Sequence, residues 1–410
     1  MLSNLSIPLV GLADTAVAGR LPGPEPLGAV AVGGAVFTFL YWGLGFLRMG
    51  TTALAAQALG RGDGAEARAV LLRALLLAGL LGGALLLLAD PLGRLALWLA
   101  GPEPEVAALA WSYYRARLWG APANLALYAA VGWLLAAQRP RATLGVLLLT
   151  NGANVALDLL LVPGLGLGVA GLGAGTALWL LRRELAPPAG ARVLAPAAFA
   201  RLLALSRDIF LRTLVLVGAF AFLTAQGARL GTVPLAANAV LLQFHTLASY
   251  LLDGFAHAAE ARSGRALGAG TRGGPGRVLG AAAGLGLAGA ALLSLLYALA
   301  GPAAVGWLST DPAVRAEALA HLPWAVLLPL ASVGAYVLDG VFVGTGRGRA
   351  MRNAMALAGL AYLAAWWLAR PLGNHGLWLA FTAFMLARAA FLLAAWRARR
   401  GGEPRGGGGR

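Results

Sequence analysis

The chain has 410 residues, of which 60% are hydrophobic and only 12% are charged, with a formal net charge of +16 and no cysteine. This composition excludes a water-soluble globular protein and indicates an all-α integral membrane protein. The lack of cysteine excludes disulfides and thiolate metal sites, and the scattering of the arginines between apolar runs disfavours a nucleic-acid-binding surface.

Runs of about 20 apolar residues predict twelve transmembrane helices. Their expected ranges are 2–19, 27–50, 69–89, 108–137, 143–162, 165–182, 205–226, 235–258, 278–299, 322–345, 352–369 and 376–396. The longest connection separates six helices from six, so we expect two pseudo-symmetric six-helix bundles. The expected parts are an N-terminal lobe (1–182), a cytoplasmic linker (183–204), a C-terminal lobe (205–396) and a disordered cytoplasmic tail (397–410).

A fixed offset of 208 residues relates the two halves of the sequence. The matched pairs include Pro104 with Pro312, Tyr128 with Tyr336, Gly132 with Gly340, and Arg139 with Arg347. Because an even number of helices separates the repeats, both bundles run in the same direction and are related by an axis along the membrane normal. Two parallel bundles that can rock about a central site are typical of transporters.

The arginines predict the orientation in the membrane. Counted on alternate connections and the termini, 23 arginines fall on one side and seven on the other. The positive-inside rule therefore places both termini in the cytoplasm. Because Ala, Gly, Leu and Arg dominate, as in a GC-rich bacterial genome, we expect a multi-pass protein of the bacterial plasma (inner) membrane.

The predicted helix 143–162 carries three polar residues on one face. Asn151, Asn154 and Asp158 are spaced by three and four residues. An ionisable residue within a span is costly unless it faces a partner or a hydrated cavity, which makes Asp158 a candidate functional residue. For Asn151 we favour the alternative, a polar contact between packed helices.

Six segments of the chain together resemble one transporter family. They are PLVGLADTAVAGRL (8–21), FLYWGLGFLRMGTTALAAQALGRGD (39–63), FLTAQGARLGTVPLAANAVLLQF (222–244), YLLDGFAHAAEARSGRALGAG (250–270), VLDGVFVGTGRGRAMRNAM (337–355) and LGNHGLWLAF (372–381). The sequence resembles the multidrug and toxic compound extrusion (MATE) family, in its DinF-like branch. The resemblance implies a twelve-helix, two-lobe antiporter that exports organic cations or other amphiphiles in exchange for protons or sodium ions. It also implies a first-lobe cation site formed by Asp14, Asn154, Asp158 and Thr176.

The depth of the two aspartates can be compared without the family. Asp14 lies six residues before Arg20, and Asp158 lies five residues before Pro163, which is roughly 9 Å and 8 Å along a helix. Two carboxylates in a poorly solvated pocket cannot both ionise cheaply, so we expect one of them to carry a proton. The alternative is a sodium ion bound by the oxygens of the four site residues. No other metal site is expected.

A second polar cluster is predicted in the C-terminal half. Tyr250, Asp253 and His257 form a stripe on one helix, and Tyr336 lies one turn from Asp339 on another. Two interpretations stay open, a hydrogen-bonded network that stabilises the lobe and a second cation site.

Three further expectations concern charged and aromatic side chains near helix ends. Asp208 lies one turn before Arg212, so we expect a structural ion pair between them. Arg388 is expected to extend its charged end to the membrane surface. Trp378 is expected to be an anchor at the membrane interface.

An apolar face is predicted near residue 40. Phe39, Trp42 and Phe46 recur at helical spacing, with Met49 beyond them. Such a face suits a substrate cavity that accepts many apolar compounds, although helix packing or lipid contact produces the same spacing.

These features predict a secondary active antiporter for multidrug efflux that works by alternating access, and not an enzyme. We expect small lipophilic or cationic substrates, a monomer in the lipid bilayer, no cofactor and no nucleic-acid partner, with the proton favoured over sodium as the coupling ion. The alternative is a flippase for lipids or lipid-linked glycans from the same superfamily. A membrane enzyme is less favoured because the connections are short. A nucleotide-driven pump is also disfavoured, because the sequence contains no GxxxxGK[ST] motif.

Overall fold

The computed structural model describes residues 25–160 and 193–400, and the regular structure in both ranges is entirely helical. This confirms the all-α class. The predicted helices 2–19 and 165–182, and with them Asp14 and Thr176, lie outside the described residues. The chain divides into two compact units, residues 1–206 with 264–270 and residues 207–263 with 271–410. The predicted lobe boundaries stay predictions.

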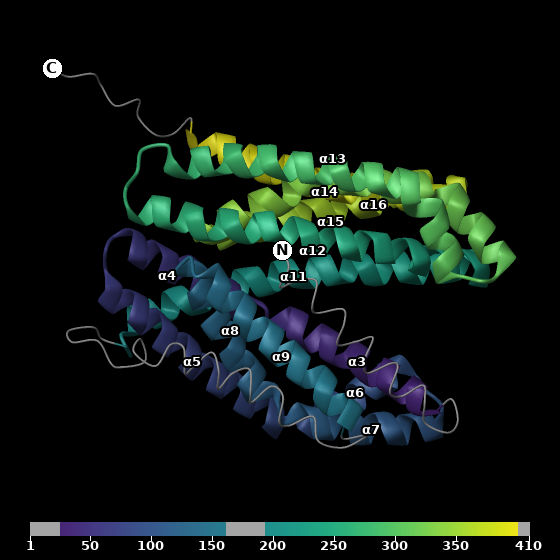
Figure 1. The fold of residues 1–410 in the computed structure, drawn as a ribbon, viewed down its shortest axis with the longest axis horizontal. Helices are drawn as coiled ribbons and strands as arrows, with labels where there is room; N and C mark the ends of the chain where they lie inside the picture. Colours follow the sequence, from purple (N-terminus) through teal and green to yellow (C-terminus); the bar gives the residue numbers. More distant parts are fainter. Residues whose placement is uncertain (1–24, 161–192, 401–410) are drawn as a thin grey trace. The chain divides into compact units, whose positions relative to one another are not determined.

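Within its described residues, unit 1 contains seven helices, the start of an eighth and the last residues of α12 (Thr232–Gly268). The first eight are α3 (Glu25–Leu44), α4 (Phe46–Gly60), α5 (Gly64–Leu87), α6 (Ala89–Ala100), α7 (Pro104–Leu118), α8 (Ala121–Ala136), α9 (Pro140–Leu160) and the first residues of α11 (Pro196–Leu230) (Figure 1). Helix α8 packs against both α4 and α5, while α3 packs against α7. Phe37 of α3 and Tyr114 of α7 stack with ring centroids 5.7 Å apart in a buried aromatic cluster.

Unit 2 is a bundle of long helices. It comprises the rest of α11, most of α12 (Thr232–Gly268), α13 (Gly274–Leu308), α14 (Pro312–Gly344), α15 (Gly348–Ala369), the short 3-10 helix η1 (Arg370–Leu372) and α16 (Gly373–Arg400). Helix α14 packs against α13 and α16, and α15 packs along α16 (Figure 1). The core of this unit is aromatic and aliphatic, with Trp378, Phe381 and Phe384 fully buried.

Nine of the predicted helices fall within the described ranges, and a tenth, 143–162, falls within them up to residue 160; each is helical there. Two of them are interrupted. The range predicted as 27–50 breaks at Gly45 into α3 and α4, and the range predicted as 108–137 breaks at Trp119 and Gly120 with a bend of 51° between α7 and α8. Pro122 contributes to the second break, because it has no amide proton to give to the carbonyl of Leu118.

Seven stretches of the described residues are long and apolar enough to cross a bilayer, and the bent pair α7 and α8 adds an eighth. Helices α11 and α12 contain 35 and 37 residues. Each is therefore over 50 Å long, against about 30 Å for the hydrocarbon core, so each extends beyond the core or tilts within it.

The internal repeat reappears in the packing inside each unit. In unit 1, a Cβ atom at Gly132 would overlap the backbone carbonyl of Arg48, so α8 approaches α4 closely at this point. In unit 2, a Cβ atom at Gly340 would overlap the carbonyl of Ala256 in the same way. Gly132 and Arg48 are each 208 residues from their counterparts. Glycine is required at both positions because any side chain would displace a neighbouring backbone.

Candidate functional site

Asp339 of α14 lies between two arginines inside unit 2. Its Oδ2 atom accepts a hydrogen bond from Nη2 of Arg212 on α11 and another, at 2.9 Å, from Nη2 of Arg388 on α16. The exposed fractions are 9% for Asp339, 7% for Arg212 and 2% for Arg388. Removing a charge from water costs several kcal/mol unless opposite charges and hydrogen bonds compensate. One carboxylate therefore holds three helices together.

This cluster corrects two expectations. Asp208 does not pair with Arg212; it accepts hydrogen bonds from Nη1 of Arg352 at 2.8 Å and from Nη2 of Arg207 at 3.3 Å. The spacing of one turn puts Asp208 and Arg212 on one face, but packing brings a different acid to Arg212. Arg388 does not reach the membrane surface, because a buried carboxylate compensates its charge inside the bundle.

A hydrogen-bonded chain extends the cluster along α12. The hydroxyl oxygens of Tyr336 and Ser249 are 2.6 Å apart, and Oγ of Ser249 is 3.4 Å from Nε2 of His245. The guanidinium of Arg388 lies over the ring of Tyr336, 5.9 Å from its centroid. Ser249 and His245 were missed from the sequence. A signal for them exists, since His245, Ser249 and Asp253 follow one another at intervals of four residues on the same helix face.

The predicted second-lobe residues are only partly brought together. Tyr336 and Asp339 belong to the cluster, and Asp253 is close enough to Tyr336 and to Tyr250 to act on both electrostatically. Tyr250, Asp253 and His257 are half-buried on α12.

Trp378 was expected at the membrane interface, and this expectation is wrong. Its side chain is fully buried in unit 2, and its Nε1 atom donates to Oδ1 of Asn238 at 2.7 Å. The amide of Asn238 donates in turn to Oδ1 of Asn374 at 2.8 Å. An indole can be buried in an apolar core when its single donor finds an acceptor there.

The first-lobe candidates are described only in part. Asn154 and Asp158 fall on α9, so both belong to one continuous helix, and their side chains lie outside the described part of the structure. Asp14 and Thr176 lie in ranges that are not described. The cation site therefore stays a prediction.

The apolar face near residue 40 is divided by the break at Gly45. Phe39 and Trp42, on α3, are 57% and 50% exposed. Phe46, at the start of α4, is buried, and Met49 is half-buried. A substrate-binding role for these four residues stays a prediction.

Comparison with known proteins decides the family. The family model MatE matches residues 1–160 and 209–367. The chain belongs to the MATE family. The two matched segments begin 208 residues apart, which is the offset of the internal repeat. Because the family signature is met once in each half, the two halves are copies of one MATE repeat.

Two relatives of this MATE protein cover nearly its whole length. The DNA damage-inducible protein F of Escherichia coli (strain K12) is 40% identical over 409 residues, which cover 96% of this chain and 89% of that protein. The probable multidrug resistance protein NorM of Rhizobium meliloti (strain 1021) is 32% identical over 426 residues, covering 95% and 88%. The resemblance to the DinF-like branch is thereby confirmed. With its apolar spans and bacterial relatives, the chain is a multi-pass bacterial membrane protein.

Solved structures confirm the fold. A MATE protein in the bent conformation has a TM-score of 0.87 at 19% identity, covering 97% of this chain and 92% of that one. A MOP superfamily transporter from Pyrococcus furiosus has a TM-score of 0.86 at 19% identity, covering 97% and 93%. At these identities the likeness establishes the MATE fold, which agrees with the predicted twelve helices, and nothing further.

Proposed function

We propose that this MATE protein is a secondary active antiporter that exports lipophilic or cationic small molecules in exchange for protons, with sodium as the alternative coupling ion. The observation that carries the proposal is the doubled family match, which begins 208 residues apart. Two like bundles can rock against each other and open a shared site alternately to either side of the membrane. The name of the relative from R. meliloti, a probable multidrug resistance protein, supports a drug-like substrate.

The charge balance of unit 2 supports coupling in the first half of the chain. Asp339 compensates two buried guanidinium groups. The carboxylate of Asp339 is bound to both guanidinium groups and joins three helices, which fits a structural role for this residue. We therefore assign the coupling ion to Asp14 and Asp158, with Asn154 and Thr176 as further oxygen donors, and we assign Asp339 to stability.

The same proposal includes the setting of the protein. It is a transporter rather than an enzyme, and it works in the bacterial plasma (inner) membrane with both termini in the cytoplasm. It acts as a monomer in the bilayer, without a cofactor or a nucleic-acid partner. The proton or sodium gradient across that membrane supplies the free energy for export.

Transport in proteoliposomes tests the function. The purified protein is reconstituted, a pH gradient or a sodium gradient is imposed separately, and the movement of a fluorescent lipophilic cation is followed. We expect movement of the cation with the pH gradient and discharge of that gradient by the added cation. Drug movement with the sodium gradient alone would identify sodium as the coupling ion. Translocation of a fluorescent phospholipid, with no response to either gradient, would contradict antiport and support a flippase.

A further inference from the structure

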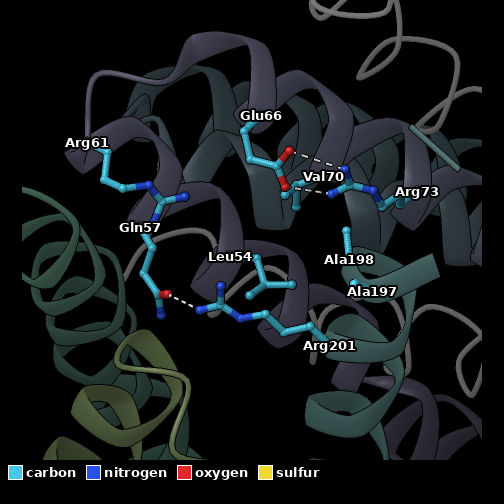
Figure 2. Close-up of a pocket in the computed structure, with 9 residues that line it drawn as sticks. All are labelled: Leu54, Gln57, Arg61, Glu66, Val70, Arg73, Ala197, Ala198 and Arg201. Atoms are coloured by element: carbon cyan, nitrogen blue, oxygen red, sulfur yellow. Dashed lines mark hydrogen bonds and ion pairs between the residues drawn. The ribbon is translucent and has the colours of Figure 1, made fainter. Parts of the chain in front are cut away.

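A cavity of about 250 Å³ lies inside unit 1, where helices α4, α5 and α11 meet (Figure 2). Gln57 lines it from the last turn of α4 and Arg61 from the residue that follows this helix. Glu66 and Arg73 line it from the N-terminal part of α5, and Arg201 from the beginning of α11. This cavity is separate from the buried cluster around Asp339 in unit 2. Nothing in the proposed antiport uses it.

The charges around the cavity do not cancel. Arg73 is buried, with 3% of its surface exposed, and is bound to Glu66 by contacts of 2.7 Å and 3.2 Å. Its Nε atom also donates to the carbonyl of Val193 at 2.8 Å. Glu66 is thus neutralised by one arginine, and Arg61 and Arg201 leave the lining with two net positive charges.

Arg201 is held in place by a neutral group. Its Nη2 atom donates to Oε1 of Gln57 at 2.8 Å, and Gln57 is itself buried. This contact orients the guanidinium, and no carboxylate in the described ranges forms an ion pair with it. Arg61 is exposed at the end of α4, and within the described part of the chain it has no ion pair. Figure 2 shows its guanidinium directed toward Gln57, on the side of the cavity where Arg201 lies.

The position of the cavity indicates which anion it suits. One apolar span ends at Gly60, the next begins at Gly64, and a third begins at Pro196. All three helices thus have their ends at the cavity, which puts it at the level of the lipid headgroups. The first turn of α11 lines the cavity, so the positive end of that helix adds to the arginine charges.

We propose that this cavity binds a phosphate group, supplied by the headgroup of an anionic phospholipid. Guanidinium groups match phosphate oxygens through paired hydrogen bonds, and basic pockets between the ends of transmembrane helices are suited to anionic headgroups. A bound phosphate bridges Arg61 and Arg201. It therefore ties the beginning of α11 to the turn between α4 and α5.

The test uses the purified full-length protein in a neutral detergent. Short-chain phosphatidylglycerol, short-chain phosphatidylcholine and inorganic phosphate are added separately, and binding is followed by thermal shift and native mass spectrometry. We expect phosphatidylglycerol to bind and raise the melting temperature, and phosphatidylcholine to do neither. Arg201→Gln and Arg61→Gln should each weaken phosphatidylglycerol binding about tenfold, because each removes one charged hydrogen bond.

Matched variants separate a site effect from misfolding. Arg272→Gln removes an exposed arginine of unit 2 and should leave binding unchanged. Arg61 makes no hydrogen bond or ion pair with another described side chain, so its replacement should not disturb folding. If Arg201→Gln unfolds, Arg201→Lys keeps the positive charge and serves in its place. Competition by inorganic phosphate supports one shared phosphate site. Binding of inorganic phosphate alone supports the site and assigns it to a soluble phosphate. Equal phosphatidylglycerol affinity in all four variants, or equal binding of both lipids, overturns the proposal.

Discussion

Asp339 and Arg388 contact each other between α14 and α16, with Oδ2 of the aspartate 2.9 Å from Nη2 of the arginine and with 12% and 2% of the two side chains exposed. The contact joins the fourth and the last long helices of unit 2. Its partners are 49 residues apart in the sequence, so the pair forms only when the bundle has assembled.

Replacing Asp339 should destabilise the protein strongly. Asp339→Asn leaves Arg212 and Arg388 without their counter-ion, and we expect a loss of about 3–5 kcal/mol in the free energy of unfolding. Thermal denaturation in detergent measures the effect. Asp311→Asn is the matched control on the same helix, because the exposed Asp311 caps α14 and asparagine caps equally well, with a change under about 0.5 kcal/mol. Similar melting temperatures for both variants would contradict a buried ion cluster.

The first-half aspartates should control coupling and leave stability nearly unchanged. Asp14→Asn and Asp158→Asn remove the charge with little change in volume, so we expect each to abolish cation-coupled export while the protein still inserts and folds. Drug efflux against a gradient, combined with the amount of folded protein in the membrane, measures both properties. Normal export by either variant would show that its carboxylate is not the coupling group.

Drug binding should depend on pH if protons are the coupling ion. If bound protons weaken the binding of a cationic drug, the bound drug must weaken proton binding by the same free energy. We expect the affinity for a lipophilic cation to rise as the pH increases from about 5 to about 8, the range in which the shared carboxylates lose their proton. Asp14→Asn should flatten this dependence. If the affinity for the lipophilic cation is independent of pH but changes with the sodium concentration, sodium is the coupling ion.

The repeat-related glycines should be equally intolerant of a side chain. Gly132→Ala and Gly340→Ala each place a Cβ atom against a backbone carbonyl, and we expect each to cost about 1–3 kcal/mol. Gly79 and Gly284 lie within helices of units 1 and 2 with open space around them, so alanine there should stabilise the protein by about 0.5–1 kcal/mol. The melting temperatures of the four variants give the comparison. A mild Gly340→Ala beside a severe Gly132→Ala would mean that the two packing contacts are not equivalent.

The orientation is open to a direct chemical test, since the chain has no cysteine. Thr271 and Thr310 are exposed at opposite ends of α13. We expect a membrane-impermeant thiol reagent to label Thr310→Cys in intact cells and to label Thr271→Cys only after the membrane is permeabilised. The opposite result would invert the predicted topology.

The sequence predicts where the helices lie along the chain far better than it predicts which side chains of different helices contact each other. Each of the ten transmembrane spans that the apolar runs predict in the described ranges is helical, because the thickness of a bilayer sets a minimum length for such runs. Helix α6 was missed because its 12 residues include Asp90 and Arg94 and are too few to cross a membrane. The partner of Arg212 lies 127 residues away and that of Trp378 lies 140 residues away. Helical spacing orders side chains within one helix, and it carries no information on which helix packs opposite.

The bend between α7 and α8 has no counterpart in unit 2. Residues 120–122 are Gly-Ala-Pro, and 208 residues later the chain reads Leu-Pro-Leu, where α14 continues without a break. A proline alone therefore does not decide the bend; the glycine that precedes it also contributes, because it favours the helix less than leucine does. Duplication supplies two copies of every helix, and selection then acts on each copy separately. One copy of this helix is continuous and the other is broken by a bend of 51°, so the two halves of a repeated sequence differ in shape at this point.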